Sequence, residues 1–193
     1  EPVDAQTVRR LHGRARGEIR AALQPFGYYD AQVDGRLERT EEGWIATYRV
    51  DPGEPVRLTS VTLRVEGDGA DDPAFEDLLA TLPLQQGESL NHSDYETAKR
   101  RLMELAAERG YVEATWVRSI LRVDPDARAA EAWLILDSGP RYRFGEIRFS
   151  PTVVSETFLR RYLPFGSGDP FEADQLRTLQ YGLDDSDYFR RVD

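Results

Sequence analysis

Cysteine is absent from the 193 residues of this chain, and histidine is almost absent. Without cysteine there are no disulfides, thiolate nucleophiles, cysteine zinc sites or iron–sulfur clusters. Of the two histidines, His92 stands in the run Asn91-His92-Ser93-Asp94, but adjacent positions at a helix start point in different directions and do not assemble a nucleophile with its base. We therefore expect this run to cap a helix, and we expect no catalytic residues.

Two further features are missing: an excess of basic residues and a long apolar segment. Lys and Arg number 25 against 35 for Asp and Glu, so the net charge of −10 disfavours nucleic acid as a partner. No apolar run approaches the ~18 residues that span a bilayer. The acidic group Asp68, Asp71 and Asp72 lacks the spacing of a calcium loop, so we expect neither metal nor cofactor.

Internal repetition is the main positive feature of the sequence. Gly27-Tyr28 recurs as Gly110-Tyr111, 83 positions later, with a weaker copy at Asp187-Tyr188-Phe189. Two other pairs keep a similar spacing: Asp51-Pro52-Gly53 with Asp137-Ser138-Gly139, and Leu82-Pro83-Leu84 with Leu163-Pro164-Phe165. One structural unit of roughly 80 residues is therefore predicted to repeat.

Hydrophobic periodicity gives the order of elements within the repeat. A strand is expected over 56–65, and Asp72 before Pro73 is typical of a capped helix start. A second helix begins at Asn91 with apolar residues every three or four positions, and two alternating runs after Gly110 predict a hairpin. The first helix of the chain has its corresponding apolar face at Val8, Leu11, Ala15, Ile19, Ala22 and Leu23.

The predicted fold is α+β, with modules of order β-α-α-β-β, each a three-stranded mixed sheet covered by two helices. The boundaries are 1–53, 54–139 and 140–193. The first module is expected to lack its opening strand and first helix. The last is expected to open with a strand that alternates at Ile147 and Phe149, and to stop in its second strand.

These motifs resemble the polypeptide-transport-associated (POTRA) domains of the BamA/TamA superfamily of outer-membrane proteins. The Gly-Tyr pair after the second helix and the run Gly139-Pro140-Arg141-Tyr142-Arg143-Phe144-Gly145 are typical of that family. Leu163-Pro164-Phe165 with Gly168-Asp169, and Leu90-Asn91 with Asp94-Tyr95-Glu96, are most similar to the TamA branch.

The resemblance implies a periplasmic arm attached to an outer-membrane barrel, with a non-catalytic scaffold role. The implied partners are a TamB-like protein anchored in the inner membrane and unfolded outer-membrane proteins such as autotransporters. The alternative is the POTRA region of another transporter of the superfamily, such as a two-partner secretion translocator.

In the family the third strand of a module is central, which implies that the second strand, here 111–123, is an edge. Edge strands can bind an extended peptide through their backbone. We expect Val112, Ala114, Trp116 and Ile120 to face the core, and Glu113, Thr115, Val117 and Ser119 to face outward and bind a partner. A covered or merely tolerated edge is the competing interpretation.

Two other surfaces are candidates for binding. Arginines Arg9, Arg16 and Arg20 form a basic stripe on the first helix that could dock an acidic surface, although a solvated face is the simpler interpretation. An exposed Trp133 would be an interaction site, whereas Trp116 is expected to pack. Arg100 and Arg101 are both expected to reach Glu104 along the helix.

Overall fold

The computed structural model describes residues 4–150 and 155–186. The weak third copy of the Gly-Tyr motif, at Asp187-Tyr188-Phe189, and the expected final strand lie outside the described residues. The chain divides into two compact units. The first comprises Glu1–Thr62, Leu82–Ala98 and Ile120–Trp133, and the second comprises Leu63–Thr81, Lys99–Ser119 and Leu134–Asp193.

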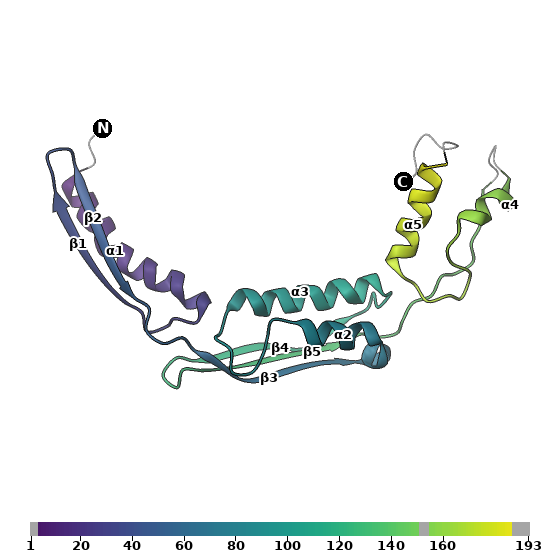
Figure 1. Cartoon of the computed structure of the whole chain (residues 1–193), viewed down its shortest axis with the longest axis horizontal. Helices are drawn as coiled ribbons and strands as arrows, with labels where there is room; N and C mark the ends of the chain where they lie inside the picture. The colour runs from purple at the N-terminus through teal and green to yellow at the C-terminus, as the bar shows by residue number, and fades with distance from the viewer. Residues whose placement is uncertain (1–3, 151–154, 187–193) are drawn as a thin grey trace. The chain divides into compact units, whose positions relative to one another are not determined.

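The first unit opens with a long helix that lies on one face of a β-hairpin (Figure 1). Helix α1 spans Ala5–Leu23 and is followed by the short 3-10 helix η1, Gln24–Phe26. Strands β1, Gln32–Arg39, and β2, Trp44–Asp51, pair antiparallel from Gln32 opposite Asp51 to Arg39 opposite Trp44. The side chain of Asp4 accepts a hydrogen bond from the Gln6 N–H, which caps α1.

The packing between α1 and the hairpin differs from the predicted helix face. His12 replaces Leu11 in the contact: its Nδ1 lies 2.8 Å from the Tyr48 hydroxyl, whereas Leu11 is 46% exposed. Ala22 is exposed as well. The reason is that the hairpin offers α1 a polar hydroxyl on Tyr48, and an imidazole satisfies that group as well as packing on its ring.

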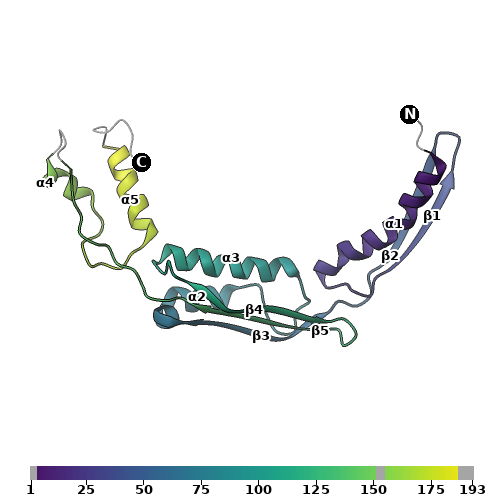
Figure 2. The same cartoon turned by 180° about the vertical axis from the view of Figure 1, so that it is seen from behind.

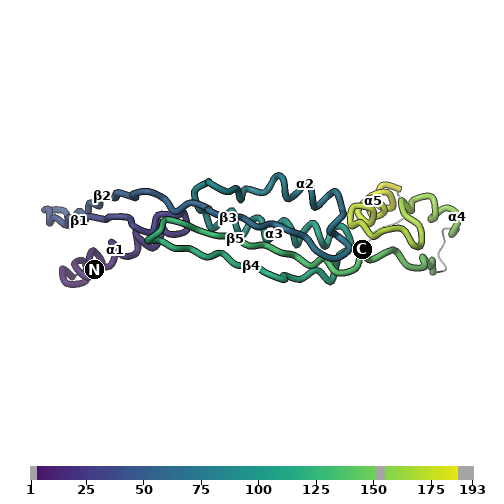
Figure 3. The backbone as a smooth tube through the Cα atoms, turned by 90° about the horizontal axis from the view of Figure 1, so that it is seen from below, coloured from purple at the N-terminus to yellow at the C-terminus, as the bar shows by residue number. Residues whose placement is uncertain are grey.

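Three further strands form a second sheet. Strands β3, Arg57–Glu66, β4, Thr115–Asp124, and β5, Ala129–Asp137, have the order β3-β5-β4 (Figure 3). Arg57 N–H donates to the Arg128 carbonyl near the start of β3 and β5, and Ser138 N–H donates to the Glu66 carbonyl at their ends. These bonds join start to start and end to end, so β3 and β5 are parallel, and the sheet is mixed as predicted.

Helices α2, Pro73–Thr81, and α3, His92–Glu108, cover the same face of this sheet (Figure 2). Both starts are capped as predicted: Asp72 Oδ1 accepts from the Ala74 N–H at 3.1 Å, and Asn91 Oδ1 accepts from the Ser93 N–H at 3.0 Å. The residues of β5 that face the helices are Ala130, Ala132, Leu134 and Leu136, each no more than 1% exposed.

The described segments after Gly139 hold short helices: α4, Glu156–Leu159, the 3-10 helix η3, Arg160–Tyr162, and α5, Ala173–Asp184. The strand expected at Ile147 and Phe149 is wrong for the described residues, where only the isolated bridge between Arg143 and Pro170 forms. A strand needs a hydrogen-bonding neighbour. Phe144 exchanges backbone hydrogen bonds with Gly168 and Asp169, but within 4–150 and 155–186 no segment pairs with residues 145–150.

Among the described residues, no helix is both long enough and apolar enough to cross a bilayer.

Candidate partner-binding site and repeat junctions

The repeated Gly-Tyr pair ends a helix in the same way in both copies. Gly27 has φ of 88° and Gly110 has φ of 85°, a left-handed conformation that favours glycine. The tyrosine N–H that follows donates back into the helix, from Tyr28 to Leu23 at 3.3 Å and from Tyr111 to Ala106 at 2.8 Å. These are C-terminal caps of the Schellman type.

At the first junction, formed in the first unit, Gly27 receives the strand that follows. Its carbonyl accepts the Val56 N–H at 2.9 Å, and the Val56 carbonyl accepts the Leu90 N–H at 2.8 Å. A Cβ at Gly27 would lie 2.6 Å from the Leu90 carbonyl oxygen. Glycine is therefore required twice here, once for the backbone conformation and once for the close approach.

The second junction, formed in the second unit, has the same bonds one repeat later. The Gly110 carbonyl accepts the Tyr142 N–H at 2.9 Å, and the Tyr142 carbonyl accepts the Phe171 N–H at 3.0 Å. A Cβ at Gly110 would lie 2.9 Å from Phe171 Cβ. The Gly-Tyr signature thus fixes how the end of one helix meets two later segments of the backbone, β3 and its loop at the first junction and residues 142 and 171 at the second.

An arginine completes each junction in the same way. Arg57 donates to the Gly87 carbonyl at 3.0 Å, and Arg143 donates to the Gly168 carbonyl at 2.9 Å. Neither contact was predicted from the sequence, although the constant spacing of the glycines was a usable signal. The same hydrogen bonds therefore form at both junctions, and they explain why the Gly-Tyr pair recurs at this spacing.

The second junction adds a charged network around Asp72, whose side chain is 3% exposed. Arg109 binds both carboxylate oxygens, at 2.9 Å and 3.0 Å, and the Tyr111 hydroxyl donates to Oδ2 at 3.0 Å. Burial alone raises the pKa of Asp72, but the hydrogen bonds from Arg109, Ala74 and Tyr111 outweigh it, so the pKa lies below its ordinary value. Asp72 is therefore more than the helix cap that the sequence predicted.

Arg141 and Glu172 extend this network. Glu172 Oε1 lies 3.2 Å from a guanidinium nitrogen of Arg109 and 3.2 Å from one of Arg141. Arg141 also donates to the Arg109 carbonyl at 3.0 Å, and its guanidinium lies 5.7 Å from the centre of the Tyr111 ring. Charged groups from the residues just before α2, just after α3 and just before α5 thus meet at one place.

The first junction has a contact between a tyrosine and a histidine instead. The Tyr29 hydroxyl lies 2.8 Å from His92 Nε2, and burial raises the pKa of Tyr29. His92 therefore joins two segments of the first unit that lie 63 positions apart in the sequence. The sequence predicted a capping run here, and it did not predict this partner.

Strand β4 is at the edge of its sheet, as the predicted topology requires, because β5 lies between it and β3. Within the second unit, Thr115 is exposed and Val117 is 58% exposed, whereas Ser119 is half-buried. An exposed apolar side chain on an edge strand is the pattern that can pair with an added strand.

This arrangement is similar to that of known proteins. Residues 1–52 match the family model described as POTRA domain, TamA domain 1. The crystal structure of POTRA domains 3–5 of Haemophilus influenzae BamA has 22% sequence identity and a TM-score of 0.50, with 94% of this chain and 71% of that chain covered. The chain has the POTRA fold.

A second solved structure is also similar to this chain. The N-terminal domain of Omp85 from the thermophilic cyanobacterium Thermosynechococcus elongatus has 19% identity and a TM-score of 0.35, and it covers 92% of this chain and 74% of that chain.

The predicted faces of the POTRA edge strand need correction. Val112 is 60% exposed because the strand begins at Thr115, and residues 112–113 form a turn. Ile120 is 42% exposed, and it shares a face with Arg122, which contacts Glu131 and Trp133 on the side of the sheet away from the helices. Ala114 and Trp116 are half-buried.

Glu113 also differs from its predicted role. Its carboxylate accepts a hydrogen bond from the Tyr142 hydroxyl at 2.7 Å, and this bond raises the pKa of Tyr142. Glu113 therefore belongs to the second junction, and the outward surface of the edge is formed by Thr115 and Val117.

Trp133 and the arginine stripe on α1 are the remaining candidates for binding. Trp133 is half-buried, with the Arg122 guanidinium 5.6 Å from its ring centre, so it is not the exposed tryptophan that would mark a binding site. Arg9, Arg16 and Arg20 are exposed on α1 as predicted. Arg16 donates to the Gly35 carbonyl at 3.0 Å, which turns it towards β1 and away from the rest of the stripe.

Proposed function

We propose that this chain is a non-catalytic POTRA scaffold that binds extended polypeptides by strand addition at β4. The observation that supports the proposal is the edge position of β4, together with the exposure of Thr115 and Val117. Backbone pairing supplies affinity with little demand on sequence, which suits a protein that handles many clients.

We further propose that the scaffold is the periplasmic arm of a TamA-like outer-membrane protein. The match of residues 1–52 to the first TamA POTRA domain supports this assignment. The partners would then be a TamB-like protein anchored in the inner membrane and unfolded outer-membrane proteins, including autotransporters. The three repeats 1–53, 54–139 and 140–193 would be successive POTRA modules.

Site-specific photocrosslinking in cells tests the role of β4. A photoreactive residue at Thr115 or Val117 should capture polypeptide, whereas one at Leu176, 42% exposed on α5, should not. Val117→Lys, which places a charge on the edge, should reduce the capture at position 115. Equal capture at Leu176 and Val117 would refute strand addition.

The identity of the captured protein tests the finer assignment. A TamB-like protein or an outer-membrane protein supports the TamA-like arm. If only a large secreted substrate were captured, the chain would instead be assigned to the two-partner secretion translocators.

A further inference from the structure

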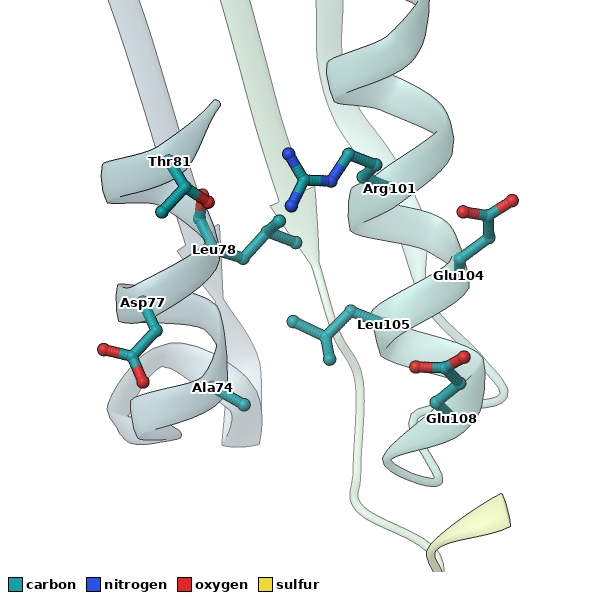
Figure 4. Close-up of a pocket in the computed structure, with 8 residues that line it drawn as sticks. All are labelled: Ala74, Asp77, Leu78, Thr81, Arg101, Glu104, Leu105 and Glu108. Carbon is teal, nitrogen blue, oxygen red and sulfur yellow. The ribbon is translucent and has the colours of Figure 1, made fainter. Parts of the chain in front are cut away.

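A groove of about 420 Å³ lies between α2 and α3 in the second unit (Figure 4). Its apolar lining consists of Ala74 and Leu78 from α2 and Leu105 from α3. All three side chains are half-buried, so each retains apolar surface that a partner could cover. The groove is separate from the edge of β4 because helices form both of its walls.

Arg101 is the unusual residue of this groove. Its side chain extends from α3 towards Leu78 and Thr81, as Figure 4 shows, and it is half-buried. The sequence predicted that Arg100 and Arg101 would both pair with Glu104, but only Arg100 does, at 3.3 Å. Within 4–150 and 155–186, Arg101 has no hydrogen bond or ion pair, so a guanidinium lies over apolar surface without an anion.

Carboxylates occupy both sides of the groove. Asp77 lies on the α2 side, and Glu104 and Glu108 lie on the α3 side (Figure 4). A ligand that fits must therefore be apolar at its centre, cationic on its flanks, and anionic at the single position that meets Arg101.

The backbone of the walls decides between a helical and an extended ligand. The N–H and C=O groups of α2 and α3 are bonded within their helices, so an extended segment would find no backbone partner there. A helix satisfies its own backbone and can place an apolar ridge between two helices.

We propose that the groove between α2 and α3 binds an amphipathic helix of a protein partner. The helix presents a Leu-type ridge to Leu78 and Leu105, basic residues to Asp77 and Glu108, and one carboxylate to Arg101. This interaction goes beyond strand addition, because it uses a different surface and a different secondary structure.

The test uses the whole 193-residue chain and synthetic 18-residue helical peptides with leucines at heptad a and d positions and lysines on both flanks. A series moves a single glutamate along the ridge, and fluorescence anisotropy measures the dissociation constants. We expect one member of the series to bind best, and Leu105→Ala to weaken that binding about tenfold.

Charge exchange gives the sharper result. Arg101→Glu should weaken the best peptide about tenfold, and replacing the peptide's glutamate by lysine should restore the affinity for that variant. Arg100→Glu is the matched control, because it changes the net charge equally one position outside the groove. Circular dichroism establishes that each variant is folded.

Several results would overturn the proposal: no binding by any peptide, equal weakening by the two arginine variants, or no restoration on charge exchange. Val117→Lys separates this proposal from strand addition, since it should leave peptide affinity unchanged. Loss of peptide binding in Val117→Lys would place the peptide at β4 and refute the groove, while leaving strand addition intact.

Discussion

Replacing Gly27 with alanine should reveal how much free energy the close approach at the first junction involves. The left-handed conformation alone costs a non-glycine residue roughly 1 kcal/mol. A Cβ at Gly27 would also lie 2.6 Å from the carbonyl oxygen of the fully buried Leu90, which cannot retreat while its N–H is bonded to Val56. Losing that bond and the Val56–Gly27 bond adds about 1 kcal/mol each. We expect Gly27→Ala to lower the free energy of unfolding by about 3 kcal/mol.

Gly87 provides the matched control for this experiment. Its φ of 93° is nearly the same as that of Gly27, but nothing lies within 4 Å of a Cβ built there. Gly87→Ala therefore measures conformational strain alone, about 1 kcal/mol. Gly110→Ala should fall between the two, because the atom that its Cβ meets at 2.9 Å is Phe171 Cβ, in a half-buried residue.

Urea unfolding followed by far-UV circular dichroism and tryptophan fluorescence measures all three variants. The expected order of destabilisation is Gly27→Ala, then Gly110→Ala, then Gly87→Ala. If Gly27→Ala and Gly87→Ala were equally destabilised, the close contact with Leu90 would contribute nothing, and the explanation of the Gly-Tyr signature would be wrong.

Three further predictions use the same measurement. Asp72→Ala removes the α2 cap and the partner of Arg109 and Tyr111, so it should cost about 3 kcal/mol, whereas the exposed neighbour variant Asp71→Ala should stay within about 0.5 kcal/mol. The pKa of Asp72 is lowered in the folded state, so the stability that wild type gains over Asp72→Asn should be constant above about pH 5. This gain should disappear below about pH 4, as the pH falls through the lowered pKa. A difference in stability that persists unchanged to pH 2 would contradict the network. Gly13→Ala should stabilise the chain by about 0.5–1 kcal/mol, since Gly13 is exposed within α1 and a Cβ there meets no atom; destabilisation would indicate a contact on that face.

Local patterns predicted the parts of the fold that depend on nearby residues. The caps at Asp72 and Asn91 and the strand 56–65 follow from short-range hydrogen bonding and hydrophobic periodicity. The edge position of β4 came from the family resemblance, and the structure confirms it.

Long-range contacts account for the predictions that failed. His12 packs where Leu11 was expected because Tyr48, 36 positions away, supplies a hydroxyl. Arg101 leaves Glu104 for a groove whose other wall is α2, and helical spacing alone cannot reveal that wall. Glu113 was assigned to a strand face because alternation does not show that the strand starts two residues later, at Thr115.

The two junctions separate what the repeat conserves in structure from what it leaves free to vary. Backbone bonds to the Gly27 and Gly110 carbonyls are the same in both, and they do not depend on side-chain identity beyond the glycine itself. Side chains then distinguish the junctions, with a Tyr29–His92 contact at the first and ion pairs between Arg109, Asp72 and Glu172 at the second. Salt screens the partly exposed Arg109–Glu172 pair more than it affects a hydrogen bond of the uncharged Tyr29 hydroxyl. The two junctions therefore share their backbone hydrogen bonds but differ in how strongly salt weakens them. The difference arises from side chains that the repeat signature does not include.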